Sequence, residues 1–152
     1  MEKKDIIKQL SSLAQLDVDA FHAYEQAIRK IDHEGIRKQL SLYQSDHRRH
    51  YDELSRTIQN MGGKAPKFSK DFKGYVIQGM TSLQSATGIK SALKSMETNE
   101  KLTNKKYEQA SSNSALPKDI HELLVSFYQD ERNHLSFIQQ ALKEKIWETT
   151  PA

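Results

Sequence analysis

The sequence contains no cysteine, and it is poor in large apolar residues. The lack of cysteine excludes disulfides, thiolate metal sites, iron–sulfur clusters and cysteine nucleophiles, so any metal must be bound by His, Asp and Glu. Leu, Ile, Val and Phe together make up roughly a fifth of the chain, close to the ~20% below which disorder is expected. A folded core must therefore be economical, as it is in helices that bury one narrow apolar stripe.

The sequence also lacks long apolar runs, runs of one charge and the common catalytic loops. The first residues lead into an amphipathic pattern with no uninterrupted apolar segment, so we expect neither a signal peptide nor a membrane span. The net charge of +3 is spread along the chain, which argues against nucleic-acid binding. No phosphate-binding glycine loop or nucleophile elbow is present. We expect a single cytoplasmic domain that spans residues 1–152.

Four long stretches carry apolar residues at helical spacing, which predicts four amphipathic helices. The break at residues 32–35 is short, so the first two helices should form a hairpin, with Asp32 as the cap of the second. Gly62 and Gly63 should end the second helix, and Pro117 should begin the fourth. The expected helices run from about Asp5 to Lys30, from the break at residues 32–35 to Met61, from Ile89 to Ser112 and from Pro117 to Trp147.

The pattern indicates two related helical hairpins joined by a long crossover. The tetrapeptide Tyr-Glu-Gln-Ala at residues 24–27 recurs at residues 107–110, and unusual polar residues recur at nearly the same offset. The loose segment from Gly62 to Gly88 is long enough to cross the whole bundle. Its apolar part, from Tyr75 to Ala86, predicts a short extra helix.

Near its midpoint, each predicted helix has ionisable residues where apolar residues are expected. Because residues i and i+3 share a helix face, Glu131 and His134 can present a carboxylate and an imidazole to one point. Residues equidistant from an antiparallel turn lie level, so the groups from all four helices should meet in one layer. Buried charges must be paired or bound to a metal. The six candidate metal ligands are Asp17, His47, His50, Glu100, Glu131 and His134.

Other ionisable and aromatic residues are expected to have structural roles. Tyr24 and Tyr107 should be core tyrosines whose hydroxyl groups are hydrogen-bonded, and a position beside the metal, supporting its ligands, is the alternative. The residues that fall off the apolar stripes or near turns should be exposed to solvent. These are His22, His33, His121 and Glu97.

These motifs resemble the ferritin-like superfamily, whose bundles bind metal through one Glu from each of two helices and a Glu-x-x-His from each of the other two. Asp17-x-x-Ala20-x-x-x-Tyr24 resembles the first helix of rubrerythrins, and Glu131-x-x-His134 matches one paired motif in full. Over nearly its whole length the chain is similar to an uncharacterised bacterial family of small ferritin-like proteins, rubrerythrin-like but without a rubredoxin domain. The resemblance implies an all-α, antiparallel four-helix bundle of ferritin-like topology with a long crossover that carries a short extra helix.

The resemblance also implies a chemistry. It implies one or two metal ions in the bundle core, with iron (a di-iron site) first and zinc or manganese as alternatives. Such a protein would be a ferroxidase-like or peroxidase-like oxidoreductase that reacts with oxygen or peroxide in stress protection. Because the chain has no cysteine, turnover would need an external electron donor.

Two departures from the superfamily pattern affect the number of metals. His47 stands where a Glu would be, and Asp17 is one carbon shorter than Glu, so Glu131 is the remaining carboxylate that can bridge two metals. The competing interpretation is a structural or stress-related bundle, as a homo-oligomer, in which the same His and carboxylate groups pair with one another and bind no metal.

Overall fold

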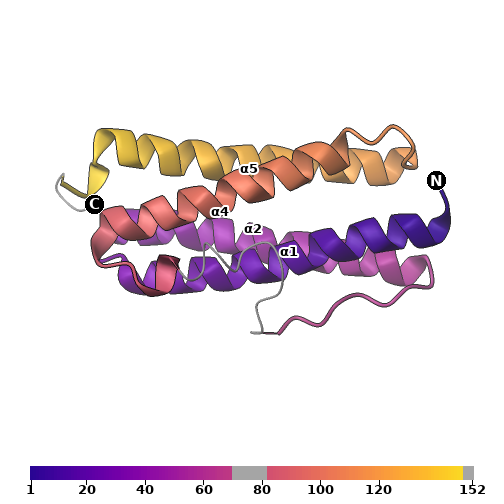
Figure 1. Ribbon diagram of the computed structural model, residues 1–152, viewed down its shortest axis with the longest axis horizontal. Coiled ribbons are helices and arrows are strands. Elements are labelled where there is room, and N and C mark those ends of the chain that lie inside the picture. Colours follow the sequence, from indigo (N-terminus) through magenta and orange to yellow (C-terminus); the bar gives the residue numbers. More distant parts are fainter. Residues whose placement is uncertain (70–81, 149–152) are drawn as a thin grey trace.

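The computed structural model describes residues 1–69 and 82–148. These residues form four long α-helices and one short 3-10 helix, and they contain no β-strand. Figure 1 shows the long helices lying lengthwise beside one another as a bundle. The helices are α1 (Lys3–Lys30), α2 (Glu34–Asn60), α4 (Gly88–Ser111), α5 (Lys118–Glu144) and η1 (Ile146–Glu148).

The long helices predicted from apolar spacing are confirmed, and their ends agree with the prediction to within about one turn. The predicted short helix from Tyr75 to Ala86 falls largely on residues 75–81, which lie outside the described residues. Of its described part, residues 82–84 are helical.

The turn between α1 and α2 is capped by His33, and the prediction that Asp32 caps it is wrong. His33 Nδ1 accepts the backbone N–H of Ile36 (3.2 Å), which satisfies a donor in the first turn of α2. In this role His33 is only 8% exposed. The expectation that His33 is solvent-exposed is therefore also wrong.

The end of α2 follows the predicted glycine signal. Gly62 adopts a left-handed conformation (φ +82°), and the N–H of Gly63 donates to the carbonyl of Ile58 (2.9 Å). A Cβ atom at Gly63 would lie 2.8 Å from the side chain of Ile7 and 2.9 Å from that of Ile58. Glycine at this position lets the chain turn close against α1.

After this turn, residues 64–69 run back along the first hairpin (Figure 1). The hydroxyl of Tyr51 donates to the carbonyl of Pro66 (2.5 Å). Phe68 packs edge-on against Phe21 (ring centroids 4.9 Å apart) and also contacts the ring of His22. His22 is 7% exposed, so the prediction that it is exposed is wrong, because a segment beyond α2 covers it.

The second hairpin joins α4 to α5 through residues 112–117. Asn113 Oδ1 accepts the N–H of Ala115 (3.0 Å), and its Nδ2 donates to Gln9 of α1 (3.3 Å). Pro117 lies at the N-cap of α5, one residue before the position predicted for it. Lys145 ends α5 in a left-handed conformation, and the following 3-10 helix packs Trp147 against the core.

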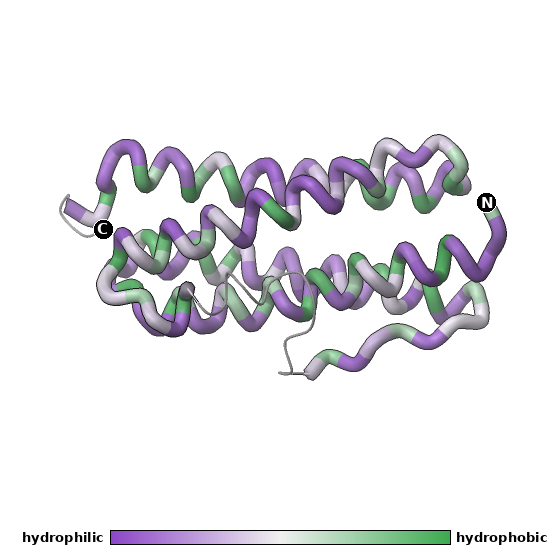
Figure 2. The backbone as a smooth tube through the Cα atoms, in the orientation of Figure 1, coloured by the Kyte–Doolittle hydropathy of each residue, from purple (hydrophilic) through white to green (hydrophobic). Residues whose placement is uncertain are grey.

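The helices pack mainly as α1 with α2, α4 with α5, and α1 with α4, whereas α2 and α5 meet only slightly. Figure 2 shows hydrophobic residues interrupted by longer hydrophilic stretches along each helix, as expected for narrow apolar stripes. Leucines such as Leu10, Leu40, Leu93 and Leu124 are fully buried in one core. Among the described helices, none is both long enough and apolar enough to cross a membrane.

Candidate metal centre

The six predicted ligand residues lie together in the middle of the bundle. α1 supplies Asp17, α2 supplies His47 and His50, α4 supplies Glu100, and α5 supplies Glu131 and His134. Their exposed fractions are all 0–1%. The structure therefore brings together all of the residues that the turn arithmetic placed in one layer.

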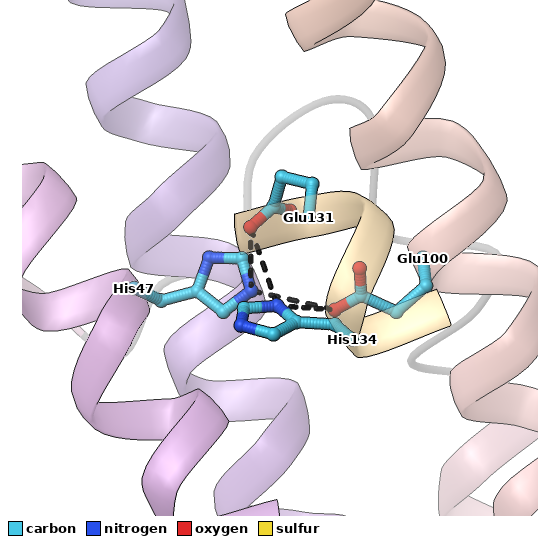
Figure 3. Close-up of side chains that lie close together, drawn as sticks. All are labelled: His47, Glu100, Glu131 and His134. Carbon is cyan, nitrogen blue, oxygen red and sulfur yellow. Dashed lines mark hydrogen bonds and ion pairs between the residues drawn. The ribbon is translucent and has the colours of Figure 1, made fainter. Parts of the chain in front are cut away.

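Four of these residues form an inner group, in which one atom of each side chain faces the others (Figure 3). His47 Nε2 lies 3.4 Å from Glu100 Oε1 and 3.6 Å from Glu131 Oε2. His134 Nδ1 lies 3.5 Å from Glu100 Oε1 and 3.3 Å from Glu131 Oε2. Two ligand atoms that each lie ~2.0–2.2 Å from one tetrahedral metal ion are about 3.3–3.6 Å apart. The four nitrogen–oxygen separations therefore match four of the six edges of a tetrahedral coordination sphere, and all four atoms lie within 4.8 Å of one another.

The ring nitrogens that face away from the inner group are held by aspartates. The Nδ1–H of His47 donates to Asp17 Oδ1 (2.8 Å), and the Nε2–H of His134 donates to Asp46 Oδ2 (2.8 Å). A carboxylate that binds the outer nitrogen of a histidine fixes the orientation of the ring and directs the other nitrogen toward a metal. Asp17 is therefore placed to support His47, a role different from the ligand role predicted for it.

His50 lies outside the inner group. Its Nδ1 is 3.2 Å from Asp17 Oδ1, and its Nε2 is 2.9 Å from Asp130 Oδ2, so both ring nitrogens are engaged. Its ring stacks on Phe127 (centroids 4.0 Å apart), and its Nδ1 is 3.8 Å from Glu131 Oε2. Asp17, His47 and His50 form a second, smaller group of metal-binding type that shares His47 with the inner group.

The two hairpins exchange equivalent contacts. The hydroxyl of Tyr24 donates to Glu100 Oε1 (2.5 Å), and the hydroxyl of Tyr107 donates to Asp17 Oδ2. Each tyrosine of the repeated Tyr-Glu-Gln-Ala tetrapeptide thus binds the buried carboxylate of the other hairpin. Both tyrosines are fully buried, and burial together with the neighbouring carboxylate raises the pKa of each well above the ordinary value.

Asp46 and Asp130 were not predicted as part of the site. They make the same kind of exchange, because Asp46 of α2 binds His134 of α5 and Asp130 of α5 binds His50 of α2. A signal for them exists in the sequence. Each aspartate directly precedes a paired motif, in Asp46-His47-x-x-His50 and in Asp130-Glu131-x-x-His134.

Residues 5–113 match the model of a protein family described as "Domain of unknown function (DUF2383)". The match covers more than half of the 152 residues. The chain belongs to this family. The DUF2383 match includes Asp17, His47, His50 and Glu100, and it ends before α5, which carries Glu131 and His134. No curated protein matches the chain.

Polar contacts also fix the DUF2383 helix α4 against α5 beside the inner group. Asn104 Nδ2 donates to the backbone carbonyls of Glu100 (2.8 Å) and Glu131 (2.9 Å). The hydroxyl of Thr103 donates to Glu100 Oε2 (3.0 Å), which leaves Oε1 of this carboxylate facing the histidines. One oxygen of Glu100 is therefore oriented toward the inner group.

The charges of the site balance when the imidazoles are protonated. Burial opposes the charged form of His47, but the carboxylates of Glu131, Asp17 and Glu100 outweigh it and raise the pKa of His47 to about 10. For the same reasons the pKa of His134 is raised above its ordinary value. Burial favours the neutral form of Glu100, but the imidazoles of His134 and His47 outweigh it and lower its pKa. Without a metal, the site is a set of buried ion pairs.

Some atoms of the inner group have no hydrogen-bond partner. Among the described residues, none donates a hydrogen bond to either carboxylate oxygen of Glu131, and His134 Nδ1 makes no hydrogen bond, although these atoms are buried. Nearly all buried polar atoms in proteins are hydrogen-bonded, since an unsatisfied one costs about 1–3 kcal/mol. Two of these atoms, Glu131 Oε2 and His134 Nδ1, face the other ligand atoms of the inner group, so this set of residues fits a metal ion.

Proposed function

We propose that the protein binds one transition-metal ion through His47 Nε2, Glu100 Oε1, Glu131 Oε2 and His134 Nδ1. The observation that carries this proposal is the set of four nitrogen–oxygen separations of 3.3–3.6 Å among buried atoms. It is supported by the carboxylate of Glu131, to which no described residue donates a hydrogen bond. Asp17 and Asp46 would hold the two ligand histidines in place through their outer nitrogens.

The donor set narrows the choice of metal. Two imidazole nitrogens and two carboxylate oxygens, with no sulfur, suit Fe(II), Zn(II) and Mn(II). Two carboxylates also neutralise the charge of a divalent ion. We propose iron first because of the resemblance to ferritin-like proteins, with zinc and manganese as alternatives. We also propose that the bundle has ferritin-like topology, that the chain folds as one domain and that the protein is cytoplasmic.

A two-metal site is the second candidate, because Asp17, His47 and His50 form another buried group of metal-binding type. The contact between Asp17 Oδ1 and His47 Nδ1 is 2.8 Å, which is a hydrogen bond and is shorter than the separation of two ligands on one tetrahedral metal. A second ion would require Asp17 to move away from His47. The geometry therefore favours one metal per chain.

With iron bound, the metal would supply the reaction with oxygen or peroxide that ferritin-like proteins carry out, in a protective oxidoreductase role. The residues of the chain would position the metal and exclude water. Glu100 is held by Tyr24 and Thr103, and His50 is held by Asp17 and Asp130. The absence of cysteine means that electrons would come from an external donor.

The competing proposal is a structural role, in which the buried histidines and carboxylates form an ion-pair network and bind no metal. The raised pKa of His47 and the lowered pKa of Glu100 favour it, because shifts in these directions are expected of an imidazolium and a carboxylate that stabilise one another without a metal. The two proposals differ in the number of metal ions bound per chain. A network binds no metal, and its stability does not respond to a chelator.

The test is a calorimetric titration of metal-free protein, made without a His tag, with Zn(II), Mn(II) and, without oxygen, Fe(II). We expect one ion per chain and the release of protons from the histidines, because the ligands must be deprotonated. His134→Ala should abolish binding. His121→Ala, at a half-buried position of α5 away from the site, is the matched control and should bind normally. If far fewer than one metal ion binds per chain, and if a chelator leaves the stability of the protein unchanged, the proposal is overturned in favour of the network.

A further inference from the structure

The proposed ligands are sealed from solvent, because their exposed fractions are 0–1%. An ion must therefore pass through the protein to reach them. One link to the surface runs through His134, whose Nε2 binds Asp46, and the side chain of Asp46 is 31% exposed. A second link runs from His50 to Asp130, which is 25% exposed. Both links reach the surface between α2 and α5, the neighbouring helices that meet only slightly.

Arg49 bridges the surface between α2 and α5, which we call the seam and which contains Asp46, Arg49, Glu53 and Asp130. Its Nη2 donates to Asp130 Oδ2 (2.7 Å) and to Asp46 Oδ1 (3.2 Å), so that one guanidinium joins the carboxylates of the two helices. Its Nη1 also lies 3.6 Å from Glu53 Oε2. Within the described part of the chain, the seam therefore holds the carboxylates of Asp46, Glu53 and Asp130 around the guanidinium of Arg49, next to His134 and His50 of the site.

Arg49 is held loosely enough to be exchanged. Its side chain is 45% exposed, and ion pairs at such exposure contribute little to stability because water and salt screen them. A divalent cation carries twice the charge of the guanidinium and prefers the same carboxylate oxygens. It can therefore compete with Arg49 for Asp46 and Asp130.

We propose that divalent metal ions load through the seam between α2 and α5, and that Arg49 is the exchangeable cation that keeps this seam closed. An incoming ion displaces the guanidinium from Asp46 and Asp130 and then passes to the buried ligands. The protons of His47 and His134 leave to solvent as the ion binds, and Arg49 then returns to the two carboxylates. This inference rests on the proposed metal site.

The test is the rate at which Arg49→Gln takes up Co(II), followed by the absorption of the bound ion after rapid mixing, and the rate of its release into excess chelator. The matched control is Arg48→Gln, which makes the same change of net charge at the neighbouring position. Arg48 pairs with Asp52 and lies over the ring of Phe68, away from the seam. Circular dichroism checks that both variants are folded.

We expect Arg49→Gln to load and release Co(II) about tenfold faster than the wild type, with Kd changed less than about threefold. Arg48→Gln should show wild-type rates. Equal rates in Arg49→Gln and the wild type, or equal increases in both variants, would overturn the proposed gating role of Arg49 and leave the proposed metal site unaffected. If the wild type binds no Co(II) at all, the proposed function itself fails, and the gate fails with it.

Discussion

Replacement of Glu131 by glutamine should remove most of the metal affinity while leaving the fold intact. Glutamine keeps the size of the side chain but lacks its charge, so the ion pairs of Glu131 with His47 and His134 are lost, while no hydrogen bond to the carboxylate from a described residue is broken. Four-ligand structural zinc sites contribute about 10–16 kcal/mol, or about 2.5–4 kcal/mol for each ligand. The loss of one ligand should therefore weaken metal binding roughly 10²- to 10³-fold.

Thermal unfolding with and without metal measures this loss. A metal at 100 times its Kd stabilises the wild type by about 2.7 kcal/mol, which for a domain of this size raises Tm by about 5–11 °C. At the same metal concentration, the variant should gain less than about 2 °C. The glutamine variant without metal should unfold cooperatively, so that its Tm can be compared with that of the wild type.

Glu97→Gln is the matched control for this variant. Glu97 is half-buried on α4, one turn before Glu100, and it lies outside the inner group. It should keep the full metal-induced rise in Tm. A full rise in Glu131→Gln would refute the ligand role of Glu131. A large fall in the Tm of its metal-free form, with no metal-induced rise in either the variant or the wild type, would favour the ion-pair network.

Three further outcomes follow from the contacts around the site. Asp46→Asn should weaken metal binding about 10–100-fold in calorimetry, because the outer nitrogen of a ligand histidine loses its carboxylate. Tyr24→Phe should lower the unfolding free energy of the metal-free protein by about 1.5–3 kcal/mol in urea, because buried Glu100 loses a hydrogen bond. The Tm of the metal-free protein should be highest between about pH 4 and pH 6.5. It should fall as the pH rises through the raised pKa of His47, about 10, and as the pH falls through the lowered pKa of Asp130, about 2.

Asp52→Asn is the control for Asp46→Asn. Asp52→Asn lies on the same helix as Asp46 and pairs only with surface Arg48 among the ion pairs described, so it should bind metal normally. Equal losses in both aspartate variants would show that only surface charge matters. A Tm of the metal-free protein that rises between pH 7 and pH 10 would contradict the assignment of His47 as a protonated partner of carboxylates.

The sequence predicted the helices and the polar layer because both depend on spacing. Helical periodicity places Asp17, Glu100 and the Glu131/His134 pair on buried faces, and the short turn at residues 31–33 sets the heights of the helices. Nothing more than the pitch of a helix is needed to bring these residues together. The convergence of the candidate ligands was therefore predictable.

Spacing did not predict which residues of the layer are candidate ligands and which support a ligand. Whether Asp17 is a ligand or supports His47 depends on which ring nitrogen faces inward, and that orientation is set by hydrogen bonds between helices far apart in sequence. The burial of His22 was missed for a related reason, since Phe68, from beyond the end of α2, covers it. Periodicity within one helix carries no information about either contact.

The most direct test of the metal centre is X-ray absorption spectroscopy on protein loaded with Zn(II), together with elemental analysis of the same sample. We predict one zinc ion per chain, with nitrogen and oxygen ligands at ~2.0–2.2 Å that include two imidazoles and no sulfur. In His134→Ala, the zinc content should fall to background. A zinc ion with fewer than two imidazole ligands, or the same spectrum from His134→Ala, would contradict the assignment of His47, Glu100, Glu131 and His134 as its ligands.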